Sequence, residues 1–304
     1  MTPQEEFDLM LVKSGVKEWH NKGHTGEGIN ILNCESNMTT HGRGTGNIIH
    51  KVAPDSFLFS GSTGIQTKGD ELISAQIELD NGERYDLHHF VEANKIDIIS
   101  ASKSGINDSC KGWNAYCKKM QDETGVVIFN SAGNNYVGDG ETLSTHFPHG
   151  VAFLVGALNV DMKRIAYSSV GQELDFMAFS GMIGGTSAAS PFMAGMMALV
   201  MSKYGKLTPS ESYKYLCDHS VDLGAIGSDT YNGKGMPILP DKTTIKLQIG
   251  SNIMTVDGIQ KLIDQPPKID PVSNRTLVPV RAIAEGFGAT VQWDSVNKEI
   301  TLEV

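Results

Sequence analysis

The sequence has no long hydrophobic run and no cluster of basic residues. A helix needs roughly 18 to 20 consecutive apolar residues to cross a membrane, and the chain of 304 residues contains no such stretch. Its first residues include several acidic side chains, unlike the basic start of a secretory signal. The net charge is −10 and no basic cluster is present, so neither nucleic acid nor an anionic membrane is expected as a partner. These absences favour a cytoplasmic protein that does not insert into membranes.

Cysteine is also scarce. The spacing of the four cysteines matches no zinc site, and four are too few to brace a chain of this length with disulfides. We therefore expect free thiols, no metal site and no cofactor. The four are Cys34, Cys110, Cys117 and Cys217.

Apolar strands alternate with helices along most of the chain. We expect strands at 28–34, 96–102, 125–133 and 150–158, and helices at 4–21 with a break near Gly15, at 41–52 capped by Thr40, at 107–123 and at 190–205. This alternation predicts an α/β fold with a doubly wound, mainly parallel sheet. Such sheets carry their sites at the carboxyl ends of strands, where Glu35, Ser102 and Asn134 fall.

The pattern changes near residue 238. Short alternating runs follow, with a hairpin signal at Asp257–Gly258 and one helix near 279–287. The segment 236–243 holds two prolines and is the expected linker. The sequence therefore predicts a large domain at 1–238 and a small β-rich domain at 243–304.

The stretch GGTSAASPFMAG (184–195) combines a glycine turn, a serine and a helix start. One alternative is a loop that binds phosphate, but such loops place a lysine just before the serine, and here the next lysine is Lys203. The other is a nucleophile, since the positive end of a helix dipole favours negative charge that develops beside Ser187. Pro191 would fall in the first turn of the expected helix, where its missing N–H costs little.

A serine nucleophile needs a base and a donor for the oxyanion. The first expected strand leads to Glu35, HGRGTG presents His41 among small residues, and NSAGN ends in Asn134. These stretches and GGTSAASPFMAG resemble, in the same order, the motifs of the subtilisin-family (subtilase) serine proteases. The lead-in NKGHTGEGINILN and the segments SSVGQELDFMAF and YNGKG are also similar to that family. The resemblance covers about residues 10–238, and it implies the subtilisin-like fold.

The resemblance implies a role for each matching residue. Ser187 would be the nucleophile, His41 the general base and Glu35 the triad acid. Asn134 and the Ser187 N–H would bind the oxyanion. The substrate main chain would pair with Ser102, Lys103 and Ser104. The substrate side chain before the scissile bond would enter a pocket lined by Ser131, Ala132 and Gly133.

Two departures from the family pattern stand out. Glu35 occupies the position of the usual aspartate, and only five residues separate it from His41, where the family has tens. Arg43 and Gly44 replace the threonine and second histidine of the family's histidine motif. The stretch NIIHKVAP directly follows the histidine motif, without room for the loop that binds calcium in the family, so we expect no family-type calcium site there. A glutamate can still accept the Nδ1 proton and orient the imidazole.

The C-terminal segment resembles a small module named after the N-terminal domain of copper amine oxidase, which occurs as an appendage on proteins of Gram-positive bacteria. The elements VPVR, FGA and WD carry the likeness. From Lys246 to Val304 there is no His or Cys, so copper is not implied. The module is expected to stabilise the protein, to form a dimer or to dock on a surface or partner.

Together these features predict a serine endopeptidase that acts on protein or peptide substrates. Few residues precede the first strand, so no prodomain is expected, and the compact chain would suit a bacterial or phage-borne processing enzyme. Two alternatives remain. One is a non-catalytic binding protein on the same fold, in which Glu35 marks the loss of activity. The other is a phosphate-binding protein that uses the 184–187 loop.

Overall fold

The computed structural model describes residues 1–68, 71–102, 111–138, 140, 142–143 and 150–303. It divides into two compact units, Met1–Leu239 and Pro240–Val304. Within the described residues, no helix combines the length and the apolar character needed to cross a membrane.

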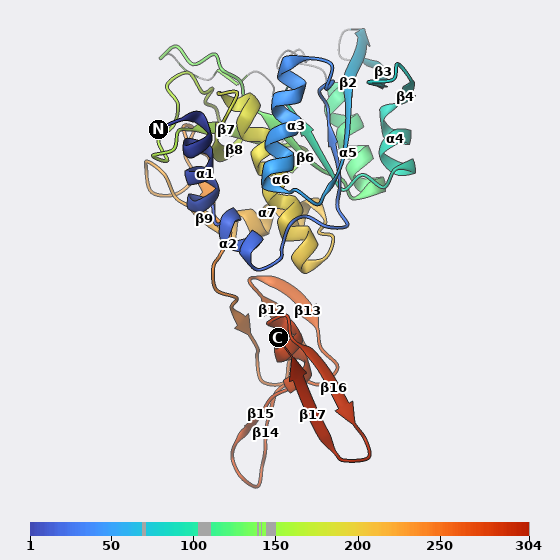
Figure 1. The fold of residues 1–304 in the computed structure, drawn as a ribbon, viewed down its shortest axis with the longest axis vertical. Coiled ribbons are helices and arrows are strands. Elements are labelled where there is room, and N and C mark those ends of the chain that lie inside the picture. The colour runs from blue at the N-terminus through green and yellow to red at the C-terminus, as the bar shows by residue number, and fades with distance from the viewer. Residues whose placement is uncertain (69–70, 103–110, 139, 141, 144–149, 304) are drawn as a thin grey trace. The chain divides into compact units, whose positions relative to one another are not determined.

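An eight-stranded sheet forms the centre of the first unit, in the order β4-β3-β2-β1-β5-β6-β7-β8 (Figure 1). Every pair from β2 to β8 is parallel, which confirms the predicted doubly wound, mainly parallel sheet. The strands β6, β7 and β8 are buried along their whole length, as in parallel sheets covered on both faces. The parallel strands are β1 (Asn30–Asn33), β2 (Phe57–Lys68), β5 (Ile98–Ala101), β6 (Val127–Ser131), β7 (Phe153–Leu158) and β8 (Leu174–Phe179).

The strands at the β4 edge of the sheet were not predicted from the sequence. Beyond Ser60, β2 continues and pairs antiparallel with β3 (Glu71–Leu79), which pairs antiparallel with β4 (Arg84–Asp86). This ribbon is only partly buried and rich in polar residues and glycine. It therefore lacks the continuous apolar run by which the central strands were recognised.

Helices flank the sheet; two of the expected ones have shifted boundaries, and the helices at 87–93 and 209–218 were not predicted. α3 (Thr40–Val52) takes Thr39 as its N-cap, whereas Thr40 was predicted. α6 (Thr186–Tyr204) begins four residues before the predicted start at 190, so the helix includes Ser187. The remaining helices of this unit are α1 (Pro3–Lys13), α2 (Val16–Asn21), α4 (Leu87–Ala93), α5 (Lys111–Thr124) and α7 (Pro209–Asp218).

α6 is the central helix of the first unit and is buried from Ala188 to Met201. α3 packs beside it (Figure 1), and a Cβ on Gly195 would lie 2.7 Å from Val52. The first unit ends with a short antiparallel pair, β9 (Ser220–Val221) and β10 (Met236–Pro237).

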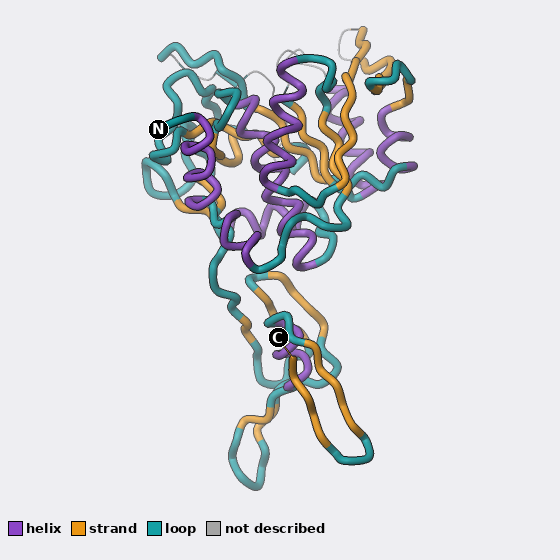
Figure 2. Tube along the Cα trace, in the orientation of Figure 1, coloured by secondary structure: helices purple, strands orange, loops and turns teal. Residues whose placement is uncertain are grey.

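The second unit consists of short antiparallel strands and one helix, as Figure 2 shows by colour. The predicted Asp-Gly turn joins β12 to β13, with φ of 49° at Asp257 and 85° at Gly258, as a two-residue hairpin turn requires. Its elements are β11 (Ile245–Lys246), β12 (Ile253–Val256), β13 (Ile259–Leu262), β14 (Lys268–Ile269), β15 (Thr276–Leu277), α8 (Val280–Gly286), β16 (Thr290–Asp294) and β17 (Glu299–Glu303).

Candidate active site

Ser187 is the second residue of α6 and is partly exposed. The turn before it contains Gly184 and Gly185, with φ of 75° and 65°, a backbone conformation that glycine adopts without strain. A Cβ on Gly185 would lie 2.7 Å from the amide oxygen of Asn134. The glycine therefore lets the asparagine approach the start of the helix closely.

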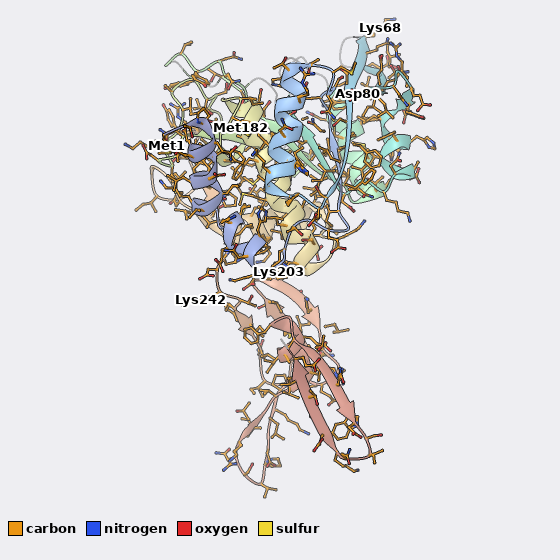
Figure 3. The ribbon with its side chains drawn as sticks, viewed as in Figure 1. Met1, Lys68, Asp80, Met182, Lys203 and Lys242 are labelled. Carbon is orange, nitrogen blue, oxygen red and sulfur yellow. The ribbon has the colours of Figure 1, made fainter. Side chains whose placement is uncertain are left out.

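The turn that leads to Ser187 also rests on the first helix of the chain. A Cβ on Gly181 would lie 2.4 Å from the Phe7 ring of α1. Met182, labelled in Figure 3, follows with a left-handed φ of 61° and is largely exposed. The packing of α1 thus supports this turn.

The position of Pro191 differs from the prediction. Because α6 begins at Thr186, Pro191 lies inside the helix and not in its first turn. A proline within a helix removes the N–H that would bond to the carbonyl four residues earlier, which here belongs to Ser187. The hydroxyl of Ser102 donates to that carbonyl at 2.8 Å. Ser102, which directly follows β5, therefore replaces the missing helical bond at the Ser187 carbonyl.

We expect Ser102→Ala to destabilise the protein and to lower turnover. The change leaves the part-buried Ser187 carbonyl without this donor, and the loss of a partner by a buried group costs about 1–3 kcal/mol. The free energy of unfolding in denaturant and kcat should both fall. Ser56→Ala is a matched control, since the Ser56 hydroxyl donates to the Ala53 carbonyl at 2.8 Å away from this helix. Wild-type stability and turnover for Ser102→Ala would contradict this role.

The amide of Asn134 is oriented by Thr186, the residue before Ser187. Its oxygen accepts from the Thr186 N–H at 3.0 Å and from the Thr186 hydroxyl at 3.2 Å. The same hydroxyl accepts from the Gly133 N–H at 3.2 Å. Since the amide oxygen is held in this way, the NH₂ group is the end left to donate elsewhere. Asn134 is exposed, so this donor can reach a bound substrate.

The Glu35 carboxylate faces the His41 ring at the end of β1. The distance between Glu35 Oε2 and His41 Nδ1 is 3.4 Å, with 13% of the glutamate side chain and 44% of the histidine side chain exposed. Because Nδ1 faces the carboxylate, Nε2 is the ring nitrogen left for another partner. Buried Asn33 fixes the local backbone, since its NH₂ group donates to the Thr45 hydroxyl at 3.0 Å and to the Glu35 carbonyl at 3.5 Å.

Packing brings the first turns of α3 and α6 to the same edge of the sheet. A Cβ on Gly44, three residues after His41, would lie 2.3 Å from the Ile183 side chain, four residues before Ser187. Among the described residues, no hydrogen bond joins the Ser187 hydroxyl to the His41 ring. Catalytic hydrogen bonds often tighten only when substrate binds.

The predicted substrate-binding residues have different environments. Ser131, Ala132 and Gly133 are buried, and the Ala132 N–H is bonded to the Val155 carbonyl at 3.0 Å. Their part in a side-chain pocket stays a prediction. Lys103 and Ser104 lie outside the described residues. The roles of the Thr186 and Ser102 side chains in orienting the site were not predicted. Pro191 could have indicated the role of Ser102, because a proline inside the helix leaves the Ser187 carbonyl in need of a donor from outside it.

The region after the histidine helix is short, as expected. Only residues 53–56 connect α3 to β2. Within the described part of the chain, no three His, Cys, Asp or Glu side chains gather as they would to hold a metal ion.

Comparison with known proteins identifies both parts of the chain. The sequence model of the Subtilase family matches residues 31–235, more than half of the chain. That of the Copper amine oxidase N-terminal domain matches residues 232–302 and confirms the likeness of the C-terminal module.

Individual relatives agree with the family match. Subtilisin DY of Bacillus licheniformis is 31% identical over 47% of this chain and 55% of its own length. The major intracellular serine protease of Bacillus subtilis is 27% identical over 67% of each chain. The chain spans about half the length of the first curated relatives it matches.

Solved structures show the same fold. MycP1 from Mycobacterium smegmatis matches with a TM-score of 0.56 and 16% identity, over 77% of this chain and 86% of that one. A lanthipeptide protease matches with a TM-score of 0.54 and 16% identity, over 77% and 92%. With a glycine turn that presents a serine, a Glu–His pair and an oriented asparagine at one sheet edge, and with this sequence match, the chain belongs to the subtilase family.

Proposed function

We propose that the chain is a serine endopeptidase with Ser187, His41 and Glu35 as its triad. The observation that carries the proposal is the contact between the Glu35 carboxylate and His41 Nδ1, at the sheet edge where Ser187 lies in the first turn of α6. Family membership supports the same conclusion. The substrate class is protein or peptide, and the chemistry needs no metal or cofactor.

The reaction follows from the atoms that these residues present. His41 Nε2 takes the proton of the Ser187 hydroxyl as Oγ attacks the scissile carbonyl, and the imidazolium then protonates the leaving amine. Glu35 holds Nδ1 and stabilises the charged ring. Water next attacks the acyl-enzyme with His41 again as base, which releases the acid product and regenerates Ser187.

The oxyanion of each tetrahedral intermediate would be bound by two donors. One is the Asn134 NH₂ group, whose oxygen end is held by Thr186. The other is the Ser187 N–H, one of the first helical N–H groups, which have no partner within the helix. Preorganised donors of this kind lower the barrier by about 3–4 kcal/mol each, as the asparagine does in subtilisin.

We also propose two domains, at 1–238 and 243–304, with the catalytic residues in the first. The separation into compact units at Leu239 and Pro240 supports this division. The C-terminal module would stabilise the protein or serve in dimer formation or docking. Likeness to the major intracellular serine protease supports a cytoplasmic location.

Labelling with a fluorophosphonate probe tests the proposed function. Only a serine activated by a base reacts with the probe, so the wild-type protein should gain its mass on the peptide that contains Ser187. A folded protein that fails to react would favour the alternative of a non-catalytic binding protein. Reaction at another serine would show that the nucleophile is misassigned.

A further inference from the structure

The segment between the triad acid and the base is unusually short. Residues 36–40 are all that joins Glu35 to His41. The Glu35 carboxylate and the His41 ring can face each other only if this connection keeps one conformation. The contacts that fix it were not expected from the sequence.

Arg43 holds the connection from the first turn of α3. One guanidinium nitrogen, Nη1, donates to the Asn37 carbonyl and to the Met38 carbonyl, both at 3.2 Å. The other, Nη2, donates to the Thr40 hydroxyl at 3.4 Å. A planar guanidinium can reach several acceptors at once, which a lysine ammonium cannot do in the same geometry. Arg43 therefore ties three of the five connecting residues together.

Ser36 anchors the beginning of the same segment. Its hydroxyl donates to Asp80, which is labelled in Figure 3, at 2.6 Å and accepts from the Met38 N–H at 3.1 Å. Its carbonyl accepts from the Thr39 N–H at 3.1 Å. A Cβ on Gly42 would lie 1.9 Å from this carbonyl, so the connection lies directly on the start of α3.

We propose that Arg43 is a positioning residue of the active site. It acts through the backbone of residues 37 and 38 and the side chain of Thr40 to keep Glu35 in contact with Nδ1 of His41, and it does not touch the substrate. The role rests on the proposed function, because it assigns a purpose to the Glu35–His41 pair. Loss of Arg43 should weaken the contact between Glu35 and His41 and so lower kcat, and it should leave substrate binding unchanged.

Arg43→Lys is the decisive variant, because it keeps the positive charge and removes the planar guanidinium group, whose N–H groups reach several acceptors at once. We expect kcat to fall about 10-fold with KM unchanged, a part of the roughly 10⁴-fold that loss of the triad acid costs in subtilisin. In a Glu35→Gln background the same change should have no further effect. Arg84→Gln is the control, since Arg84 is an exposed arginine that pairs with Glu78 on the β3–β4 ribbon. It should leave kcat at the wild-type value.

A second measurement does not depend on turnover. In inactive Ser187→Ala protein, the Nδ1 proton of His41 can be followed by NMR. The partner of Nδ1 decides whether this nitrogen carries the proton, so Arg43→Lys should weaken the Nδ1 proton signal as the contact with Glu35 loosens. A purely electrostatic role would leave this signal unchanged in Arg43→Lys and weaken it only in Arg43→Gln.

The outcomes separate the two proposals. A wild-type protein that neither labels nor hydrolyses would overturn the proposed function, while a weakened Nδ1 proton signal of His41 in Arg43→Lys would still support the positioning role. An active enzyme in which Arg43→Lys changes neither kcat nor this signal would overturn the role of Arg43. Equal losses in the wild-type and Glu35→Gln backgrounds would also overturn it, because Arg43 would then act only on overall stability.

Discussion

Ser187→Ala should abolish peptide hydrolysis and probe labelling in a protein that remains folded. The change removes the atom that we propose forms the acyl-enzyme, and in subtilisin the corresponding loss is about 2 × 10⁶-fold in kcat. Ser187 is partly exposed, and among the described residues its hydroxyl makes no hydrogen bond. The free energy of unfolding should therefore change by no more than about 0.5 kcal/mol. Single-turnover hydrolysis and denaturant unfolding measure the two effects.

Ser202→Ala is the matched control for this prediction. Ser202 lies on the same helix, and its hydroxyl donates to the Leu199 carbonyl at 2.9 Å. This variant should keep full activity. Hydrolysis by Ser187→Ala at a rate close to that of the wild type would show that another residue is the nucleophile.

Glu35→Gln should lower turnover by about 10⁴-fold, as loss of the triad acid does in subtilisin, yet leave measurable activity. Glutamine cannot stabilise the imidazolium, and its NH₂ end favours the wrong tautomer of His41. Ser187, His41 and the oxyanion donors remain and account for the residual rate. Glu18→Gln is a suitable control, because Glu18 is a partly exposed residue of α2 paired with Lys22. Near wild-type turnover in Glu35→Gln would place the acid elsewhere.

Glu35→Asp should also lower turnover, although it keeps the charge. The aspartate carboxylate would end about 1.5 Å further from His41, the length of one carbon–carbon bond. The backbone cannot easily follow, since the Ser36 carbonyl lies against Gly42 and its hydroxyl bonds to Asp80. If Glu35→Asp matches or exceeds the wild-type kcat, the connection is more adaptable than these contacts imply.

The sequence was sufficient to predict the parts of the fold that depend on local pattern. The buried runs of β6 and β7 identified central parallel strands, and the ends of β1, β5 and β6 placed Glu35, Ser102 and Asn134 at one sheet edge. Such predictions need only hydrophobic periodicity and the rule that sites in parallel sheets lie at the carboxyl ends of strands.

Features that depend on contacts between distant segments could not be predicted in this way. The β2–β3–β4 ribbon is stabilised by pairing and not by a buried run of its own. The start of α6 was placed too late, because Thr186 and Ser187 have weak helix propensity and follow two glycines, while Pro191 is typical of the first turn of a helix. The hydrogen bonds from Arg43 to residues 37, 38 and 40 could not be predicted either, because they form only when residues 36–40 fold back against the start of α3.

If the proposed function holds, the burial of α6 decides how the protein resists digestion by copies of itself. Proteolysis needs an extended stretch of backbone, which a folded protein supplies through local opening. To open α6 next to Ser187 would expose side chains that are buried from Ala188 to Met201, at a cost close to that of unfolding the whole unit. Self-digestion should therefore begin at partly exposed segments such as the β3–β4 ribbon and spare the helix that carries Ser187.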